Sequence, residues 1–397
     1  MARHWFLICL AAAVTVPAIA LRVGGISPAQ PIITAALFGV AIVGGAFLLT
    51  WAAEVAEMDI SQGLALSFLA LVAVLPEYAV DLYFAWKAAA HPEYTAYAAA
   101  NMTGANRLLV GIAWPLIVLL YWLHGRHTEL KLPATRAVEL VFLTLATVYS
   151  FVIPLKGTIS LLDTVVLIGI FAAYMWRIAG AKAEEPDLVG PALALAAFRP
   201  ARRRASIVIM FLFSAAVILA SAEPFAEALI KLGRRSGIDE FLLVQWLAPL
   251  ASEAPEVVIA CILTLKGDAQ AGMGAMVSAK VNQWTLLVGT LPLVYSAGLG
   301  APGALHLDSR QVEEIALTAA QSLFAVAVLC NLRLSIFEAL VLFVLFASQL
   351  LLPSPAVRYG FALTYTALAV ATLVRNRKAL SGFFHAGLRA PLGRVRA

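Results

Sequence analysis

Apolar runs of about helix length follow one another along the whole chain, separated by short polar breaks or by Pro and Gly. About 20 apolar residues in helical conformation cross a bilayer, whereas a membrane β-barrel would show short segments of alternating polarity. The pattern therefore predicts an all-α polytopic membrane protein of about 12 transmembrane helices. These predicted helices cover residues 4–22, 32–54, 63–87, 97–122, 136–153, 159–177, 205–230, 240–265, 270–297, 311–330, 334–352 and 356–374.

The composition excludes a soluble enzyme. Of the 397 residues, 62% are hydrophobic and 13% are charged, whereas a soluble domain has about 25% charged residues. The net charge of +5 would suggest a nucleic-acid partner in a soluble protein, but in a membrane protein it is explained by the enrichment of Lys and Arg in cytoplasmic loops. Most Lys and Arg residues fall on the side of the predicted membrane that carries both chain ends. We therefore expect an integral protein of the plasma (inner) membrane with both termini cytoplasmic.

Two halves of the chain resemble each other. Residues 136–144 match residues 310–318 at the same spacing, and the pair Pro76-Glu77 is repeated as Pro255-Glu256. Each copy holds five predicted helices, and because five is odd, the second copy enters the membrane with inverted topology. The predicted organisation is an N-terminal transmembrane helix at 1–31, a first repeat at 32–178, a cytoplasmic linker at 179–204, a second, inverted repeat at 205–352, and a last transmembrane helix with a basic cytoplasmic tail at 353–397.

Four acidic residues lie inside the predicted membrane-spanning helices. A carboxylate at this depth is costly and indicates a functional site. Glu77 and Asp81 are four residues apart, and Glu253 and Glu256 are three residues apart. Each pair therefore shares one face of its helix. Pro76 and Pro255 break the helices beside the repeated glutamates and free backbone carbonyls. The sequence therefore predicts that the four carboxylates converge on a cation at the membrane midplane.

Amide and hydroxyl groups follow in the next helix of each copy. Hard cations prefer carboxylate, carbonyl and amide oxygens, and the candidates are Asn101, Asn106, Ser278 and Asn282. The alternative is that these groups only bind one another between packed helices. Two cations in the same helices are candidates for charge compensation or proton coupling: Lys280 pairs with Glu253 or Glu256, and Arg107 either reaches the membrane boundary or pairs with Asp81.

These motifs resemble the Ca²⁺/cation antiporter superfamily, which includes the sodium/calcium exchangers. Residues 72–77 and 251–256 are similar to the family's Gly-Thr-Ser-Leu-Pro-Glu, and residues 100–106 and 276–282 to its Gly-Asn-x-x-Gly-Ser-Asn. The resemblance implies two inverted five-helix repeats, Glu77 and Glu256 as the central metal ligands, and Ser252 as a hydroxyl ligand. The first copy lacks the Thr-Ser hydroxyls, which in the family look like sodium ligands, and the second copy gains Glu253 and Lys280. We therefore expect a divergent member coupled to H⁺ instead of, or as well as, Na⁺.

The expected function is secondary-active antiport by alternating access, in which Ca²⁺ or a similar cation is exchanged for Na⁺ or H⁺. A monovalent Na⁺/H⁺ antiporter of the same fold is the alternative, and a membrane scaffold or an intramembrane enzyme is the non-transport alternative. An aspartyl protease would need two facing Asp residues, and only Asp81 qualifies, so no enzyme is expected. No Gly-rich phosphate loop occurs. The expected partners are inorganic cations and the lipid bilayer, without cofactor, nucleotide or nucleic acid.

Overall fold

The computed structural model describes residues 2–26, 28–59, 74–179, 188–351 and 354–389, and these are almost entirely helical. Within these ranges, nine helices are long and apolar enough to cross a membrane. Most predicted transmembrane helices in the described part agree with the observed ones to within a few residues at each end, and the prediction 240–265 coincides with the observed helix Glu240–Leu265. Residues 63–73 of the third predicted helix, residue 352 and residues 390–397 of the tail lie outside the described residues.

The described chain divides into two compact units, and each unit combines parts of both predicted repeats. Unit 1 holds residues 1–83 and 182–256, and unit 2 holds residues 84–181 and 257–397. The helices of unit 1 are α1 (Ala2–Ala13), α2 (Val16–Val23), α3 (Pro31–Ala56), the first part of α5 (Leu75–Ala88), α11 (Ala192–Ala196), α12 (Pro200–Ser236) and most of α13 (Glu240–Leu265).

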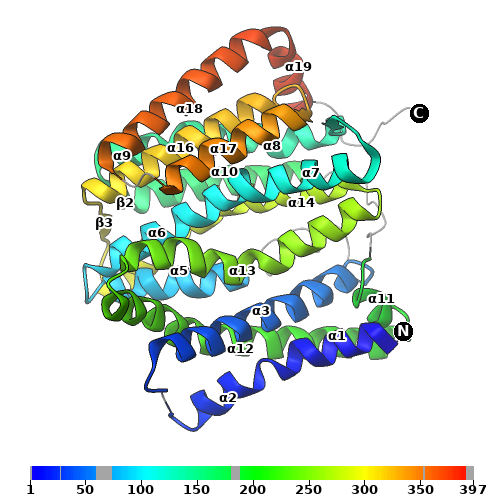
Figure 1. Ribbon diagram of the computed structural model, residues 1–397, viewed down its shortest axis with the longest axis vertical. Coiled ribbons are helices and arrows are strands. Elements are labelled where there is room, and N and C mark those ends of the chain that lie inside the picture. The colour runs from blue at the N-terminus through cyan, green and yellow to red at the C-terminus, as the bar shows by residue number, and fades with distance from the viewer. Residues whose placement is uncertain (1, 27, 60–73, 180–187, 352–353, 390–397) are drawn as a thin grey trace. The chain divides into compact units, whose positions relative to one another are not determined.

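Helices α3 and α12 run side by side in unit 1 (Figure 1). Glycine allows this approach, because a Cβ atom on Gly39 would lie 2.9 Å from the ring of Phe225. On another face of α3, a Cβ on Gly44 would lie 2.6 Å from the carbonyl oxygen of Ala11 in α1. Helix α12 has 37 residues and is therefore about 55 Å long, nearly twice the apolar thickness of a bilayer. Its basic ends thus extend beyond the predicted span 205–230.

The described part of the predicted linker packs onto unit 1. The ring of Phe198 stacks on Trp5 of α1, and the backbone N–H of Val189 donates to Glu54 at the end of α3. Arg203, at the start of α12, forms an ion pair with Asp59 at 2.7 Å. These contacts fix the described linker residues to α1 and α3. Residues 180–187, which include the predicted acidic pair Glu184-Glu185, lie outside the described residues.

Unit 2 holds the remaining elements. These are the end of α5, α6 (Tyr94–Leu108), a π-helical turn (Leu109–Ala113), α7 (Trp114–Gly125), β1 (Glu129–Lys131), a 3₁₀ turn (Ala134–Arg136), α8 (Ala137–Ser150), α9 (Val152–Lys156), β2 (Thr158–Ser160), α10 (Leu161–Ala179), α14 (Ala269–Asn282), a second π-helical turn (Gln283–Leu287), α15 (Val288–Leu299), β3 (Ala304–His306), α16 (Ser309–Leu329), β4 (Arg333–Ser335), α17 (Ile336–Leu351), α18 (Pro355–Arg375) and α19 (Arg377–Leu388).

The loops of unit 2 show the internal repeat directly. In each half, one strand precedes the fourth repeat helix (β1 and β3) and one precedes the fifth (β2 and β4). Strand β1 pairs with β4, and β2 pairs with β3, both antiparallel. Each half therefore contributes its first strand to one sheet and its second strand to the other, which is the reciprocal pattern expected of two copies related by a two-fold axis.

Helix starts repeat in the same way. Directly after β2, the backbone N–H of Ser160 donates to Asp163 in the first turn of α10, and after β4 the N–H of Ser335 donates to Glu338 in the first turn of α17. The third helix of each half also contains a π-helical turn, at Leu109–Ala113 and at Gln283–Leu287. The two copies thus share local hydrogen-bonding details as well as their order of helices.

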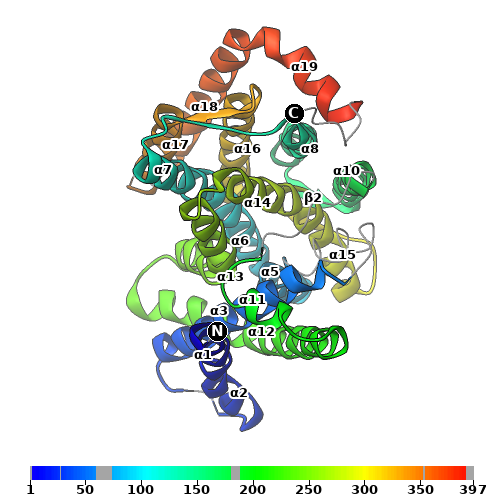
Figure 2. The ribbon, with the colours of Figure 1, turned by 90° about the vertical axis from the view of Figure 1, so that its right-hand side faces the viewer.

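Two features differ from the predicted all-α chain with a basic tail. The four strands have three residues each, too few for an alternating polarity pattern to reveal them. Part of the predicted tail forms helix α19, which turns back from the end of α18 and packs against α8 (Figure 2). Phe383 and Gly387 of α19 are buried, and the side chain of Arg177 donates to the carbonyl of Gly387. These few apolar positions were hidden among the Lys and Arg residues of the tail.

We expect the Asp59 contact to stabilise unit 1 in a pH-dependent way. The hydrogen-bonded Arg203 guanidinium lowers the pKa of Asp59 below its usual value, so the ionised carboxylate stabilises the fold above the unfolded-state pKa, and this contribution is lost as the pH falls through the lowered folded-state pKa. Asp59→Asn should therefore lower the unfolding temperature in detergent by a few degrees at neutral pH and by less in acid. The control is Arg202→Gln, because Arg202 is adjacent to Arg203 but lies over the Phe198 ring instead of pairing with Asp59. An equal loss at every pH would contradict this role.

Candidate cation-binding site

Helix α5 carries the first pair of predicted acidic ligands. Glu77 is 3% exposed and Asp81 is inaccessible to solvent, and one turn of helix separates them. Pro76 precedes Glu77 in the first turn of α5, while Val72 and Ala73 of the motif lie outside the described residues. Two carboxylates that are almost fully buried in one apolar helix are the arrangement predicted for a functional site.

Helix α13 carries the second pair. Ser252 and Glu253 are buried, and Glu256 is half-buried. Pro255 lies inside the helix and has no N–H to donate to the carbonyl of Ala251, four residues earlier. The Ser252 hydroxyl donates to the carbonyl of Pro249 at 3.2 Å, which leaves its oxygen lone pairs as the groups that could face a cation. Helix α13 nevertheless continues through Pro255 without interruption, so the predicted break is observed only as a missing backbone hydrogen bond, and the local chemistry is that of an oxygen-rich stretch of continuous helix.

All four predicted acids belong to unit 1. Among the residues that the structure describes, no three His, Cys, Asp or Glu side chains lie close enough together to hold a metal ion. The structure thus does not bring three of the four carboxylates together in the arrangement that it shows. Convergence of Glu77, Asp81, Glu253 and Glu256 on one cation stays a prediction.

Two predicted amide ligands carry unused acceptors in unit 2. The Oδ1 atoms of Asn101 on α6 and Asn282 on α14 are buried, and neither accepts a hydrogen bond from the described residues. A buried amide oxygen without a donor is costly, and ordered water or a bound cation commonly satisfies it. These two side chains therefore remain suitable ligands.

Lys280 on α14 is fully buried, and its ammonium is held by Asn106 on α6. The Nζ atom donates to Asn106 Oδ1 at 2.8 Å and to the Asn106 backbone carbonyl at 3.0 Å, and it lies 5.0 Å from the centre of the Trp284 ring. Asn106 Nδ2 in turn donates to the carbonyl of Met102. The Asn106 oxygen that we expected to bind a cation thus binds the ammonium of Lys280. The predicted pairing of Lys280 with Glu253 or Glu256 stays a prediction.

Ser278, two residues before Lys280 on α14, is half-buried and hydrogen-bonds to the phenol of Tyr174 on α10. This bond gives the predicted hydroxyl ligand a structural partner within unit 2. A single hydroxyl has two acceptor lone pairs, so the contact with Tyr174 does not remove its capacity to bind a cation.

Arg107 has a partner that the sequence did not indicate. Its side chain is 2% exposed and pairs with Glu314 on α16 at 2.6 Å. Arg358 on α18 binds the neighbouring Glu313 at 2.8 Å, so α6, α16 and α18 are joined by two buried ion pairs. With 2% exposure, Arg107 is enclosed by protein, and its predicted reach to the membrane boundary or pairing with Asp81 stays a prediction. The sequence does show two adjacent acids, Glu313 and Glu314, inside the predicted transmembrane helix 311–330. Acidic residues in such a helix indicate that a buried cation pairs with them.

The chain matches the family model described as "Sodium/calcium exchanger protein" over residues 30–179 and again over residues 206–354. The chain belongs to this family. It is therefore a multi-pass membrane protein of an exchanger family rather than an enzyme, as expected from the sequence. A comparison with curated proteins finds no significant match.

Solved structures give the same fold. The match to the H⁺/Ca²⁺ exchanger CAX has 43% sequence identity and a TM-score of 0.94, and it covers 97% of this chain and 98% of that one. Native YfkE is 16% identical over 90% of this chain and 99% of its own, with a TM-score of 0.63. The sodium-calcium exchanger NCX_Mj is 14% identical over 80% of this chain and 96% of its own, with a TM-score of 0.53. The last two similarities concern the fold alone.

We predict that the buried pair of Arg107 and Glu314 contributes strongly to stability. Glu314→Gln leaves a buried guanidinium without its closest carboxylate, which should lower the free energy of unfolding by about 3–5 kcal/mol. The matched control is Glu129→Gln, because Glu129 pairs with the half-exposed Arg333 at 3.4 Å and should contribute at most about 1 kcal/mol. Unfolding in detergent, followed by fluorescence, measures both variants. Equal losses would contradict the importance of the buried pair.

Proposed function

We propose that the protein is a secondary-active antiporter that exchanges Ca²⁺ for H⁺ by alternating access. The near-complete match to the H⁺/Ca²⁺ exchanger CAX is the observation that carries this proposal. The buried carboxylates and amides of the predicted site support it, because they are the ligands that hard cations prefer.

In the proposed exchange, Glu77 and Glu256 are the central ligands of the transported metal. Two carboxylates balance the charge of one Ca²⁺, and two protons on the same oxygens balance it equally when the metal leaves. Asp81, Glu253, Ser252, Asn101 and Asn282 would supply further oxygens. The two states therefore have the same net charge in the low-dielectric membrane, which is the physical reason for proposing proton competition at these groups.

Lys280 supports coupling to H⁺ rather than to several Na⁺ ions. Its buried ammonium, held by Asn106, is a fixed positive charge inside the membrane and can take the place of a bound monovalent ion. The same lysine favours a second candidate, a monovalent Na⁺/H⁺ antiporter, because a fixed positive charge lowers the demand for a divalent cation. We also propose, from the distribution of Lys and Arg, that both termini are cytoplasmic and that the protein lies in the plasma (inner) membrane.

Ion flux in proteoliposomes tests the proposed exchange. Wild-type protein should accumulate Ca²⁺ against its gradient when a pH gradient is imposed, and an equal Na⁺ gradient should drive less. Glu77→Gln and Glu256→Gln should each lower Ca²⁺ flux roughly tenfold or more, since a lost charged ligand is expected to cost at least about 1.4 kcal/mol of binding. The control is Glu240→Gln at the start of α13. Unchanged flux in both site variants would contradict the site, and Na⁺ transport without Ca²⁺ transport would favour the second candidate.

Neutralising Lys280 should change the pH dependence of transport. If its positive charge acts on the carboxylates, its loss in Lys280→Met favours their protonated form, so the pH of half-maximal Ca²⁺ flux should rise. Lys280→Arg keeps the charge and should stay close to the wild-type profile. Lys266→Met, in an exposed loop, controls for the general effect of removing a lysine. A Lys280→Met profile identical to that of the wild type would remove the proposed role in proton coupling.

A further inference from the structure

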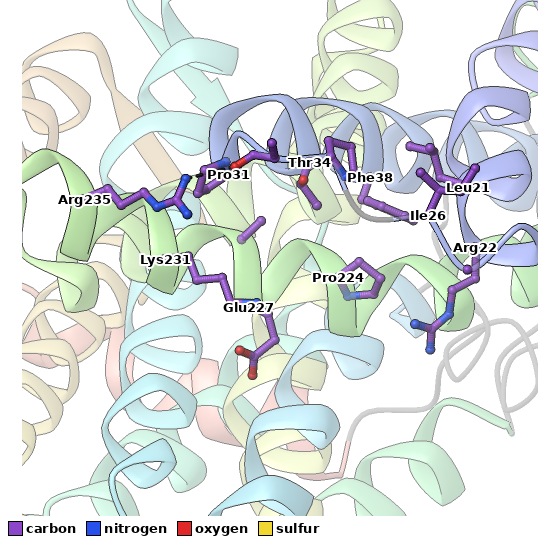
Figure 3. A pocket seen from close by; sticks show the side chains of 14 residues that line it. Leu21, Arg22, Ile26, Pro31, Thr34, Phe38, Pro224, Glu227, Lys231 and Arg235 are labelled. Carbon is purple, nitrogen blue, oxygen red and sulfur yellow. Dashed lines mark hydrogen bonds between the residues drawn. The ribbon is translucent and has the colours of Figure 1, made fainter.

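Unit 1 contains a pocket away from the predicted cation ligands, at the ends of three helices. It has a cavity volume of about 380 Å³ and lies between the end of α2, the start of α3 and the last third of α12. Figure 3 shows Arg235 and Arg22 at opposite ends of the pocket, with Lys231 and Glu227 between them on α12. None of these residues belongs to the proposed exchange site.

The lining carries more positive than negative charge. Arg22, Lys231 and Arg235 contribute three cations, and Glu227 is the one acid among the lining residues. Glu227 accepts a hydrogen bond from the Tyr83 hydroxyl at 2.7 Å, which holds its carboxylate toward α5. The charge of the pocket therefore favours an anion.

Both arginines are held in place, whereas Lys231 is not. Arg22 pairs with Glu223 at 2.7 Å, and Arg235 donates to the carbonyl of Ala29 at 2.9 Å. Among the described residues, no side-chain or backbone acceptor binds the ammonium of Lys231. Lys231 also lies before the last turn of α12, which ends at Ser236, so favourable interaction with the helix C-terminus does not account for it. The geometry thus leaves one cation available between two oriented guanidinium groups.

The start of α3 adds to the positive potential. Pro31 begins this 26-residue helix and lines the pocket together with Thr34, and the side chain of the N-cap residue Gln30 makes no capping hydrogen bond. Pro31 has no N–H and the N–H groups of Ile33 and Thr34 donate to the Gln30 carbonyl, so the helix start acts on an anion mainly through the partial positive charge of its N-terminus. The helix end and the three cationic side chains therefore favour the same kind of ligand.

Apolar residues form the rest of the lining. Leu21, Ile26, Phe38 and Pro224 lie in the pocket together with the cations. The pocket lies where the predicted transmembrane helices 4–22 and 205–230 end and 32–54 begins, on the side of the predicted membrane opposite both termini, so its charged part would meet lipid headgroups and its apolar part acyl chains. We propose that this pocket binds a phosphate group, supplied by the headgroup of an anionic phospholipid.

Lipid binding to the purified full-length protein tests the proposal without any transport measurement. The probes are phosphatidylglycerol, phosphatidylcholine and inorganic phosphate, added in detergent and measured by native mass spectrometry. Wild-type protein should retain phosphatidylglycerol in preference to phosphatidylcholine. Lys231→Gln together with Arg235→Gln should weaken phosphatidylglycerol binding roughly thirtyfold, as expected for two cations at a membrane surface. Lys231→Gln alone breaks no hydrogen bond or ion pair among the described residues and should weaken phosphatidylglycerol binding roughly fivefold.

Arg234→Gln is the matched control, because Arg234 is adjacent on α12, 61% exposed and paired with Glu240, and it does not line the pocket. This variant should bind phosphatidylglycerol like the wild type. Wild-type binding in the double variant, or equal retention of the two phospholipids by the wild type, would overturn the proposal. Competition by inorganic phosphate at the affinity of the lipid would overturn the lipid as the source of the phosphate group.

Discussion

The low dielectric of the membrane is the constraint on which the other features of this protein depend. A charge that leaves water must be compensated inside the protein, and the structure shows how this is done in unit 2. Lys280 is bound by both oxygens of Asn106, and Arg107 is bound by Glu314. Because Asn106 and Arg107 are adjacent in α6, two cations are compensated at neighbouring positions of a single helix. This explains why α6, α14 and α16 carry so many polar groups in a chain that is otherwise strongly apolar.

The internal repeat has a structural consequence beyond duplication of helices. The strand pairs β1 with β4 and β2 with β3 join the two halves of the chain reciprocally within unit 2, and the two compact units each take helices from both repeats. Neither repeat therefore forms a compact unit by itself. Division between two mixed units, rather than between two repeats, is compatible with transport in which one bundle of helices moves against another.

The sequence predicted the helices well, because an apolar run of 20 residues has few alternatives in a chain of this composition. It also led to Glu77, Asp81 and Glu253, which are indeed buried, since a carboxylate within such a run is visible without a structure. It did not predict the observed partners of Lys280 and Arg107, which are Asn106 and Glu314. Glu314 was missed because a single sequence does not show which helices pack together, and α19 and the four strands were missed because their apolar signal is spread over only a few residues. The ligand set of the cation site remains a prediction for the same reason.

The central claim is that Ca²⁺ and H⁺ compete for the same carboxylates in the membrane. Strict exchange requires reciprocity, so a Ca²⁺ gradient alone must drive protons in the opposite direction across a proteoliposome membrane. We expect that Ca²⁺ added outside acidifies the outer solution in proportion to Ca²⁺ uptake, with both signals lost together in Glu256→Gln. Ca²⁺ uptake without any counter-movement of protons, at a clamped membrane potential, would contradict the account.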